Sequence, residues 1–172
     1  QYRNHAYITD IRFTKSMLYT NDMFIPEDRL TTNFIDKQKS SWNIDSMVGA
    51  TDTYNPKFGT AAAVFDGTGD KLTVSSDDSF TFTANEDYTI EGWIKTEQVG
   101  LVDAYPSIIT TGTTSLEIGL NGYVAGCESV DGTKNYITSN VTVNDDKWHH
   151  VAISRNTGIT RLFVDGVLQT ET

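Results

Sequence analysis

The chain has 172 residues, of which 38% are hydrophobic and 11% aromatic, so it holds enough apolar material for the core of one folded domain. Its 13 basic and 23 acidic residues give a formal net charge of −10, which excludes a typical nucleic-acid-binding protein with clustered Lys and Arg. No apolar run approaches the roughly 18 residues of a membrane span, and Cys127 alone excludes an intramolecular disulfide.

The first predicted element lies in the stretch AYITDIRFTKSMLYTNDMF, residues 6–24. Its alternation of apolar and polar residues predicts that residues 7–20 form an edge or closing strand of a β-sandwich. Residues 1–40 hold six basic and five acidic residues, net +1, whereas residues 41–172 hold seven and eighteen, net −11. This shift of charge indicates a boundary near residues 30–40. The start of the chain lacks the basic and then apolar pattern of a secretory signal.

From residue 61 onward the sequence predicts short strands separated by turns. "AAAVF" and "KLTV" flank "DGTGD", which predicts a tight hairpin, and Asn121-Gly122 and Asp165-Gly166 are two-residue hairpin turns. No window shows the 3.6-residue spacing of an amphipathic helix, so an antiparallel β-sandwich is the expected fold. Residues 31–60 are less regular. The further strands are expected at 87–96, 107–111, 115–120, 134–139, 147–155 and 160–170.

Three motifs in this order resemble a known family. They are KFGTAAAVFDGTGDKLTV (57–74), DYTIEGWIK (87–95) and DDKWHHVAISR with TRLFVDGVLQ (145–169). Together they look like a laminin-G-like jelly roll of the concanavalin A-like lectin/glucanase superfamily. The resemblance implies an all-β fold, an antiparallel jelly-roll β-sandwich in which one of two packed sheets is curved.

The beginning of the chain is similar to the closing strand of this family, especially as found in tandem copies on phage tail or virion proteins. The similar residues are 7–26, YITDIRFTKSMLYTNDMFIP, and they stand before the jelly roll instead of after it. The usual apolar first strand is reduced to "LTTNF", residues 30–34. We therefore divide the chain into residues 1–30, a closing strand and linker, and residues 31–172, the jelly roll. Whether the strand closes this unit or a neighbouring one, by strand exchange, is open at this point.

The superfamily includes glucanases, which need two carboxylates facing one site about 5–9 Å apart. Their Glu-x-Asp-x-Glu pattern places three acids on one face of a strand. Here Glu91 is followed at alternate positions by Trp93 and Lys95, and Glu117 stands alone. We therefore expect no catalytic residues and no enzyme. Turnover abolished by Glu91→Gln or Glu117→Gln would revive an active glucanase.

The adjacent His149 and His150 suggest a metal site, but successive side chains of a strand point to opposite faces and cannot ligate one ion. We expect one to be packed inside and the other to lie on the opposite face. Cys127 is interpreted as a buried small hydrophobic residue.

Calcium is the one cofactor that the sequence suggests, since aspartates gather in its turns. Asp66 and Asp70 bracket the hairpin predicted at "FDG" and are the named candidates; an ordinary turn role is the alternative. The other acidic pairs are Asp77 with Asp78 and Asp145 with Asp146.

The leading hypothesis is a non-catalytic structural or recognition module on a virion or phage surface, which supports assembly, decoration or attachment to host glycans. The alternative is a glycan-binding module of a bacterial secreted protein or adhesin. The expected partners are subunits of the same assembly and cell-surface glycans, and the expected location is the virion surface or outside the cell. Tyr105, Tyr123 and Tyr136 are candidates for stacking on sugars, with core packing or simple exposure as the alternative.

Overall fold

The computed structural model shows an almost entirely β structure, with no α-helix among the residues that it describes. None of these residues forms a helix long and apolar enough to cross a membrane. The described residues are 6–14, 44–48, 50–52, 56–58, 62–66, 69–74, 80, 82–83, 86–99, 106–119, 121–130 and 133–171.

The larger of two facing sheets has seven strands, and every described pairing in it is antiparallel. In spatial order its strands are β13 (Val167–Glu171), β12 (Ile159–Val164), β11 (Trp148–Asn156), β6 (Tyr88–Thr96), β1 (Ala6–Thr14), β4 (Ala62–Phe65) and β3 (Ala50–Asp52).

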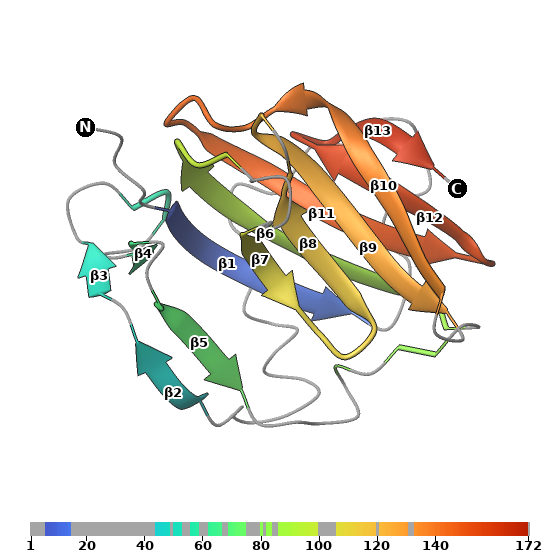
Figure 1. Ribbon diagram of the computed structural model, residues 1–172, viewed down its shortest axis with the longest axis horizontal. Coiled ribbons are helices and arrows are strands. Elements are labelled where there is room, and N and C mark those ends of the chain that lie inside the picture. Colours follow the sequence, from blue (N-terminus) through green and yellow to red (C-terminus); the bar gives the residue numbers. More distant parts are fainter. Residues whose placement is uncertain are drawn as a thin grey trace.

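The smaller sheet has four antiparallel strands and lies in front of the larger one (Figure 1). Its spatial order is β10 (Thr133–Thr142), β9 (Tyr123–Val130), β8 (Thr114–Ile118) and β7 (Ser107–Thr110). A separate two-stranded sheet pairs β2 (Ile44–Val48) with β5 (Lys71–Val74). The two facing antiparallel sheets confirm the predicted β-sandwich.

The hydrophobic core fills the space between the two sheets. It is built by alternate residues of each strand, as the two-residue period of a strand requires. β6 and β11 contribute Ile90 and Ile153, and β8 on the opposite sheet contributes Leu116, all of them 0% exposed. On β6 the intervening residues are buried too, so this strand is covered on both faces.

β1 lies inside the seven-stranded sheet and not at an edge, so the edge position predicted for residues 7–20 is wrong for the strand that forms. It pairs with β6 on one side and with β4 on the other. A bulge sets Asp10 and Ile11 opposite Gly92, which has no side chain to obstruct the extra residue. Residues 15–20 lie outside the described residues. The division at residue 30 stays a prediction.

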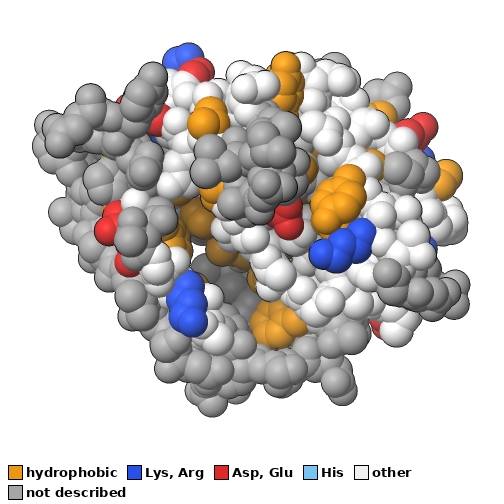
Figure 2. All heavy atoms as spheres, viewed as in Figure 1, with side chains coloured by type: hydrophobic (Ala, Val, Ile, Leu, Met, Phe, Trp, Pro, Cys, Tyr) orange, Lys and Arg blue, Asp and Glu red, His pale blue; other side chains and the backbone are white. Residues whose placement is uncertain are grey.

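The inward side chains of β1 are less deeply buried than those of its neighbour β6. Ile8, Ile11 and Phe13 pack against the core but are only half-buried. Figure 2 shows the surface hollowed between β5 and β7, the region where Figure 1 places β1. The four-stranded sheet therefore covers β6 and β11 more completely than β1.

The prediction of a hairpin around "DGTGD" is wrong, although a strand forms on each side of this segment. β4 pairs with β1 and β3, whereas β5 pairs with β2 in the separate sheet. The connection therefore crosses between two sheets. Gly69 still has the positive φ (82°) that a turn glycine provides.

The two-residue turns are confirmed. Asn121-Gly122 and Asp165-Gly166 have positive φ at both positions, as a type I′ hairpin requires, and Thr157-Gly158 forms a third such turn. Cys127 is free and buried, at 7% exposure, as expected for a small hydrophobic residue.

Candidate functional site

Glu91, which the resemblance to glucanases singles out as a possible catalytic acid, lies on the outer face of the seven-stranded sheet. Its side chain is fully buried, and one carboxylate oxygen accepts hydrogen bonds from the guanidinium of Arg12 on β1. The other oxygen lies 3.0 Å from Nε2 of the fully buried His150 on β11. The carboxylate is thus held by groups from the two strands that flank β6.

Aromatic and basic side chains surround this buried carboxylate. The ring of Trp93 packs edge-on against His150 at 5.4 Å and against Phe58 at 5.7 Å. Nζ of Lys57 lies 4.3 Å from the Trp93 ring centroid, a cation–π contact. Trp93 is only 8% exposed, so its ring is not available to stack on a sugar.

Glu117 cannot supply the second carboxylate of a glycosidase pair with Glu91. On β8 its neighbours Leu116 and Ile118 face the core, so Glu117 points outward from the four-stranded sheet and accepts a hydrogen bond from Ser115 Oγ at 2.8 Å. Glu91 points outward from the opposite sheet. The whole sandwich separates the two acids, whereas hydrolysis needs them on either side of one bond.

The two adjacent histidines point to opposite faces of β11, as predicted. His150 is the buried one. His149 lies between two carboxylates near the surface, with Nδ1 2.7 Å from Asp165 Oδ2 and Nε2 2.9 Å from Asp145 Oδ1. Since carboxylates only accept, this geometry suits an imidazolium that donates from both nitrogens.

The ionic contacts of this cluster shift its pKa values. The hydrogen bond with Asp165 raises the pKa of His149 despite partial burial, which acts in the opposite direction. The hydrogen bond from Lys147, followed by that from His149, lowers the pKa of Asp145 to about 2. Burial acts to raise the pKa of Asp165, but hydrogen bonds from His149 and from the His150 N–H lower it overall. The cluster joins the segment before β11 to the β12–β13 turn.

The calcium candidates form a turn. Oδ2 of Asp70 accepts a hydrogen bond from the backbone N–H of Asp66 at 2.8 Å, so one oxygen of the pair has a structural partner. Within the described part of the chain, no three or more His, Cys, Asp or Glu side chains are grouped to hold a metal ion. Calcium at Asp66 and Asp70 stays a prediction, and Asp77 and Asp78 lie outside the described residues.

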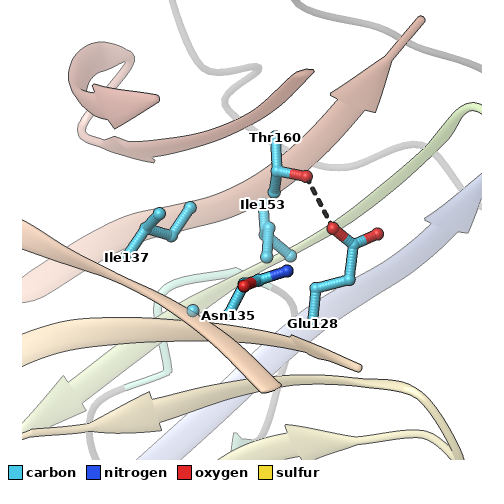
Figure 3. Close-up of a pocket in the computed structure, with 6 residues that line it drawn as sticks. Glu128, Asn135, Ile137, Ile153 and Thr160 are labelled. Atoms are coloured by element: carbon cyan, nitrogen blue, oxygen red, sulfur yellow. Dashed lines mark hydrogen bonds between the residues drawn. The ribbon is translucent and has the colours of Figure 1, made fainter. Parts of the chain in front are cut away.

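A small pocket opens between the sheets, lined by Glu128 and Thr160 among others (Figure 3), and Glu128 also forms a buried ion pair with Arg155. Glu128 accepts hydrogen bonds from Arg155 Nη1 at 2.7 Å and from Thr160 Oγ1 at 2.9 Å. Burial, reinforced by the Glu128 carboxylate, raises the pKa of the nearby Tyr88 phenol above its ordinary value. The pocket volume is about 10 Å³, room for roughly one water molecule and not for a sugar ring. Its lining residues are Gly126, Glu128, Asn135, Ile137, Ile153 and Thr160.

Of the three tyrosines considered for sugar stacking, Tyr136 has the most accessible ring. It lies on β10 and is 53% exposed, with the exposed Lys134 and Thr138 at alternate positions on the same face. Figure 2 shows the corresponding face, on which a large hydrophobic side chain lies beside a basic one over β9 and β10. Tyr123 is half-buried, and Tyr105 lies outside the described residues.

The partners of two residues singled out from the sequence become visible only in the structure. Arg12 is the ion-pair partner of Glu91, and Asp145 and Asp165 are the partners of His149. The sequence did contain a signal for the cluster around His149. Asp165 lies in a tight turn at the end of the strand that pairs with the "WHH" strand. No local sequence pattern indicates the ion pair between Arg12 and Glu91, because the two residues are 79 positions apart in the chain.

Comparison with known proteins identifies the family. The family model described as the concanavalin A-like lectin/glucanases superfamily, of laminin-G type, matches residues 66–172. No curated protein and no solved structure matches the chain significantly. The matched segment includes β5 to β13, whereas β1 lies outside it. Through this match and its two-sheet architecture, the chain belongs to the laminin-G-like family of the concanavalin A-like lectin/glucanases superfamily.

Proposed function

We propose that this protein is a non-catalytic recognition module of a virion or phage surface protein, which attaches the particle to host glycans and contributes to its assembly. The observation that carries the proposal is the state of Glu91. A general acid or nucleophile must reach its substrate, and this carboxylate is fully buried between Arg12 and His150. Within the described part of the chain, the two acids singled out from the sequence, Glu91 and Glu117, form no accessible pair, which suits this domain of a lectin-like family to binding and not to hydrolysis.

The recognition part is supported by the exposed ring of Tyr136. A sugar presents C–H groups on one face of its ring, and these pack on aromatic side chains while polar neighbours bond the hydroxyls. Lys134 and Thr138 provide such polar groups on either side of Tyr136 along β10. The outer face of β10 is therefore the surface proposed to contact a glycan.

A glycan array with matched variants tests the proposal. Native protein is expected to bind one sugar class, and Tyr136→Ala to weaken that binding roughly fivefold, because ring stacking contributes about 1 kcal/mol. Tyr136→Phe keeps the ring and most of the binding. Val167→Ala, which shortens an exposed side chain on the other sheet, is the control and leaves binding unchanged. Binding that does not respond to Tyr136→Ala contradicts the assignment of this face.

The alternative, a glycan-binding module of a bacterial secreted protein or adhesin, has the same chemistry in another setting. Genomic context separates the two. Neighbouring virion structural genes favour the first, and a signal peptide or surface anchor in the gene favours the second.

A further inference from the structure

Lys134 differs from most of the basic side chains that the structure describes. Five of these pair with carboxylates: Arg12, Lys95, Lys147, Arg155 and Arg161. Lys57 instead lies over the buried ring of Trp93, and Lys71 begins β5. Lys134 is exposed and forms no ion pair with any described residue, although the chain holds 23 acidic residues against 13 basic ones. Its charge is therefore available to a partner from outside.

Lys134 also lies on the outer face of β10, two residues before Tyr136. Such alternate residues of a strand share a face and are about 7 Å apart, a distance that one sugar ring with a charged substituent can span. Tyr136 is 53% exposed, and it is the one aromatic side chain among the exposed large hydrophobic residues of the described chain. Figure 2 shows a basic side chain beside a large hydrophobic one over β9 and β10. A cation and a stacking ring thus form one surface.

The neighbouring strand β9 places a hydroxyl group, and not an acid, beside Lys134. Ser129 is directly opposite Lys134 in the antiparallel register, and opposite residues share a face with Cβ atoms about 5 Å apart. Glu128 precedes Ser129 and points the other way, into the sandwich. Glu117 does lie on the outer face, but on β8 opposite Ala125, so it is roughly 10 Å from β10. The ammonium group and the half-buried Ser129 hydroxyl can therefore donate hydrogen bonds to one acceptor.

We propose that the outer face of β10 binds a sugar that carries a carboxylate. The Lys134 ammonium group and the Ser129 hydroxyl donate hydrogen bonds to the carboxylate, and the Tyr136 ring packs against the C–H groups of the sugar. This inference rests on the proposed glycan-binding function and names the class of glycan. A neutral sugar would make the ring contact but would gain nothing from the charge of Lys134.

The net charge of −10 opposes an anionic ligand, so distance decides which effect dominates. At physiological salt the Debye length is about 8 Å, and exposed charges farther than this from the carboxylate are largely screened. Glu117, two strands away, is beyond that range, whereas Lys134 would be in direct contact. The local attraction therefore dominates. An exposed ion pair of this kind adds roughly two- to fivefold in affinity, which is enough to favour a carboxylated sugar over its neutral counterpart.

A double-mutant cycle between protein and glycan tests the proposal. The probes are oligosaccharides that end in glucuronic acid or in sialic acid, each compared with its methyl ester, which keeps the sugar and removes the charge. Calorimetric titration gives their affinities for native chain and for Lys134→Gln. We expect esterification to weaken binding to native chain roughly threefold, and to leave binding to Lys134→Gln nearly unchanged, because that variant lacks the cation. The oligosaccharide with the larger ester effect identifies the source of the carboxylate.

Two variants on the same face are the controls. Lys134→Arg keeps the charge and should keep the ester effect, whereas Tyr136→Ala should weaken the binding of acid and ester by the same factor, because it removes the ring contact. An ester effect that is equal in native chain and Lys134→Gln, or absent from both, overturns the proposal. Lys134 would then serve only to keep the edge strand β10 from pairing with other chains.

The outcome also separates this proposal from the function on which it rests. Binding of neutral oligosaccharides through Tyr136, with no preference for the carboxylated ones, overturns the proposal and leaves the recognition function in place. Binding of no oligosaccharide of any class contradicts the recognition function itself.

Discussion

Among single residues, Arg12 has a large expected effect on stability. Its guanidinium is the partner of a fully buried carboxylate, so Arg12→Met leaves Glu91 without that cation. We expect the variant to lower the free energy of unfolding by about 3–5 kcal/mol, measured by urea denaturation. Arg12→Met combined with Glu91→Gln removes the buried charge as well, and should recover part of the loss. A single variant as stable as the native chain would show that the pair does not hold β1 in place.

His149 makes a pH-dependent contribution to the free energy of unfolding, which can be measured separately. Its pKa is raised in the folded state, chiefly by Asp165, from an unfolded value of about 6.5. The stabilisation is therefore fully present below about pH 6.5 and disappears as the pH rises through the folded-state pKa. Asp145 and Asp165 are 42% and 49% exposed, so we expect less than about 1 kcal/mol.

The measurement compares the unfolding free energies of native chain and His149→Gln from pH 5.5 to pH 9, with steps of about half a unit. The native chain should be more stable at the acid end, and the difference should shrink towards the alkaline end. A difference that grows with pH would mean that the neutral imidazole is the form held by the two aspartates.

At the residue scale, the sequence correctly predicted to which face of a strand a side chain points, but not which residue it pairs with. The two-residue period correctly set His149 and His150 on opposite faces, because that follows from strand geometry alone. It also put Trp93 and Lys95 on the face of Glu91. It did not find Arg12, since an ion pair between distant strands depends on which strands become neighbours.

Tight turns connect several strands of the fold. Two of these turns, at Gly122 and Gly158, allow the effect of the same glycine substitution on stability to be compared. Gly122 and Gly158 both have φ +84° at the second position of a two-residue hairpin. A Cβ at Gly158 meets nothing within 4 Å, whereas one at Gly122 would lie 2.3 Å from Cγ of Asn144. The two sites therefore share the backbone strain and differ in the steric clash.

We expect Gly158→Ala to lower the unfolding free energy by about 1–2 kcal/mol, the cost of a left-handed conformation for an L-residue. Gly122→Ala should cost more, because Asn144 must also move. Chemical denaturation of both variants gives the comparison. Equal losses of unfolding free energy in the two variants would show that the Asn144 side chain moves away at no cost, so that the clash does not affect stability.

At the scale of elements, local signals predicted the strands and some turns, but not every pairing. Asn121-Gly122 and Asp165-Gly166 were correct, because a two-residue I′ turn forces its flanking strands together. The hairpin expected at "DGTGD" was wrong, because its longer connection allows β4 and β5 to enter different sheets. β1 was recognised as a strand, but its place between β6 and β4 depends on non-local contacts.

For the whole molecule, the fold class was predictable and the candidate site only in part. Three ordered motifs indicated the laminin-G-like sandwich, which the family match and the two facing sheets confirm. Glu91 and Glu117 were identified from sequence as the acids to test. That they point outward from opposite sheets, and that Glu91 is buried against Arg12 and His150, required the three-dimensional structure.

With the proposed function, we expect this lectin-like domain to bind glycans without cleaving them. The most direct measurement incubates the glycan class selected on the array with native chain, and then analyses the glycan by mass spectrometry. We expect the glycan to be recovered intact, with the same result for Glu91→Gln. Shortened glycan with native chain, and intact glycan with Glu91→Gln, would contradict a non-catalytic role and establish an active glycosidase.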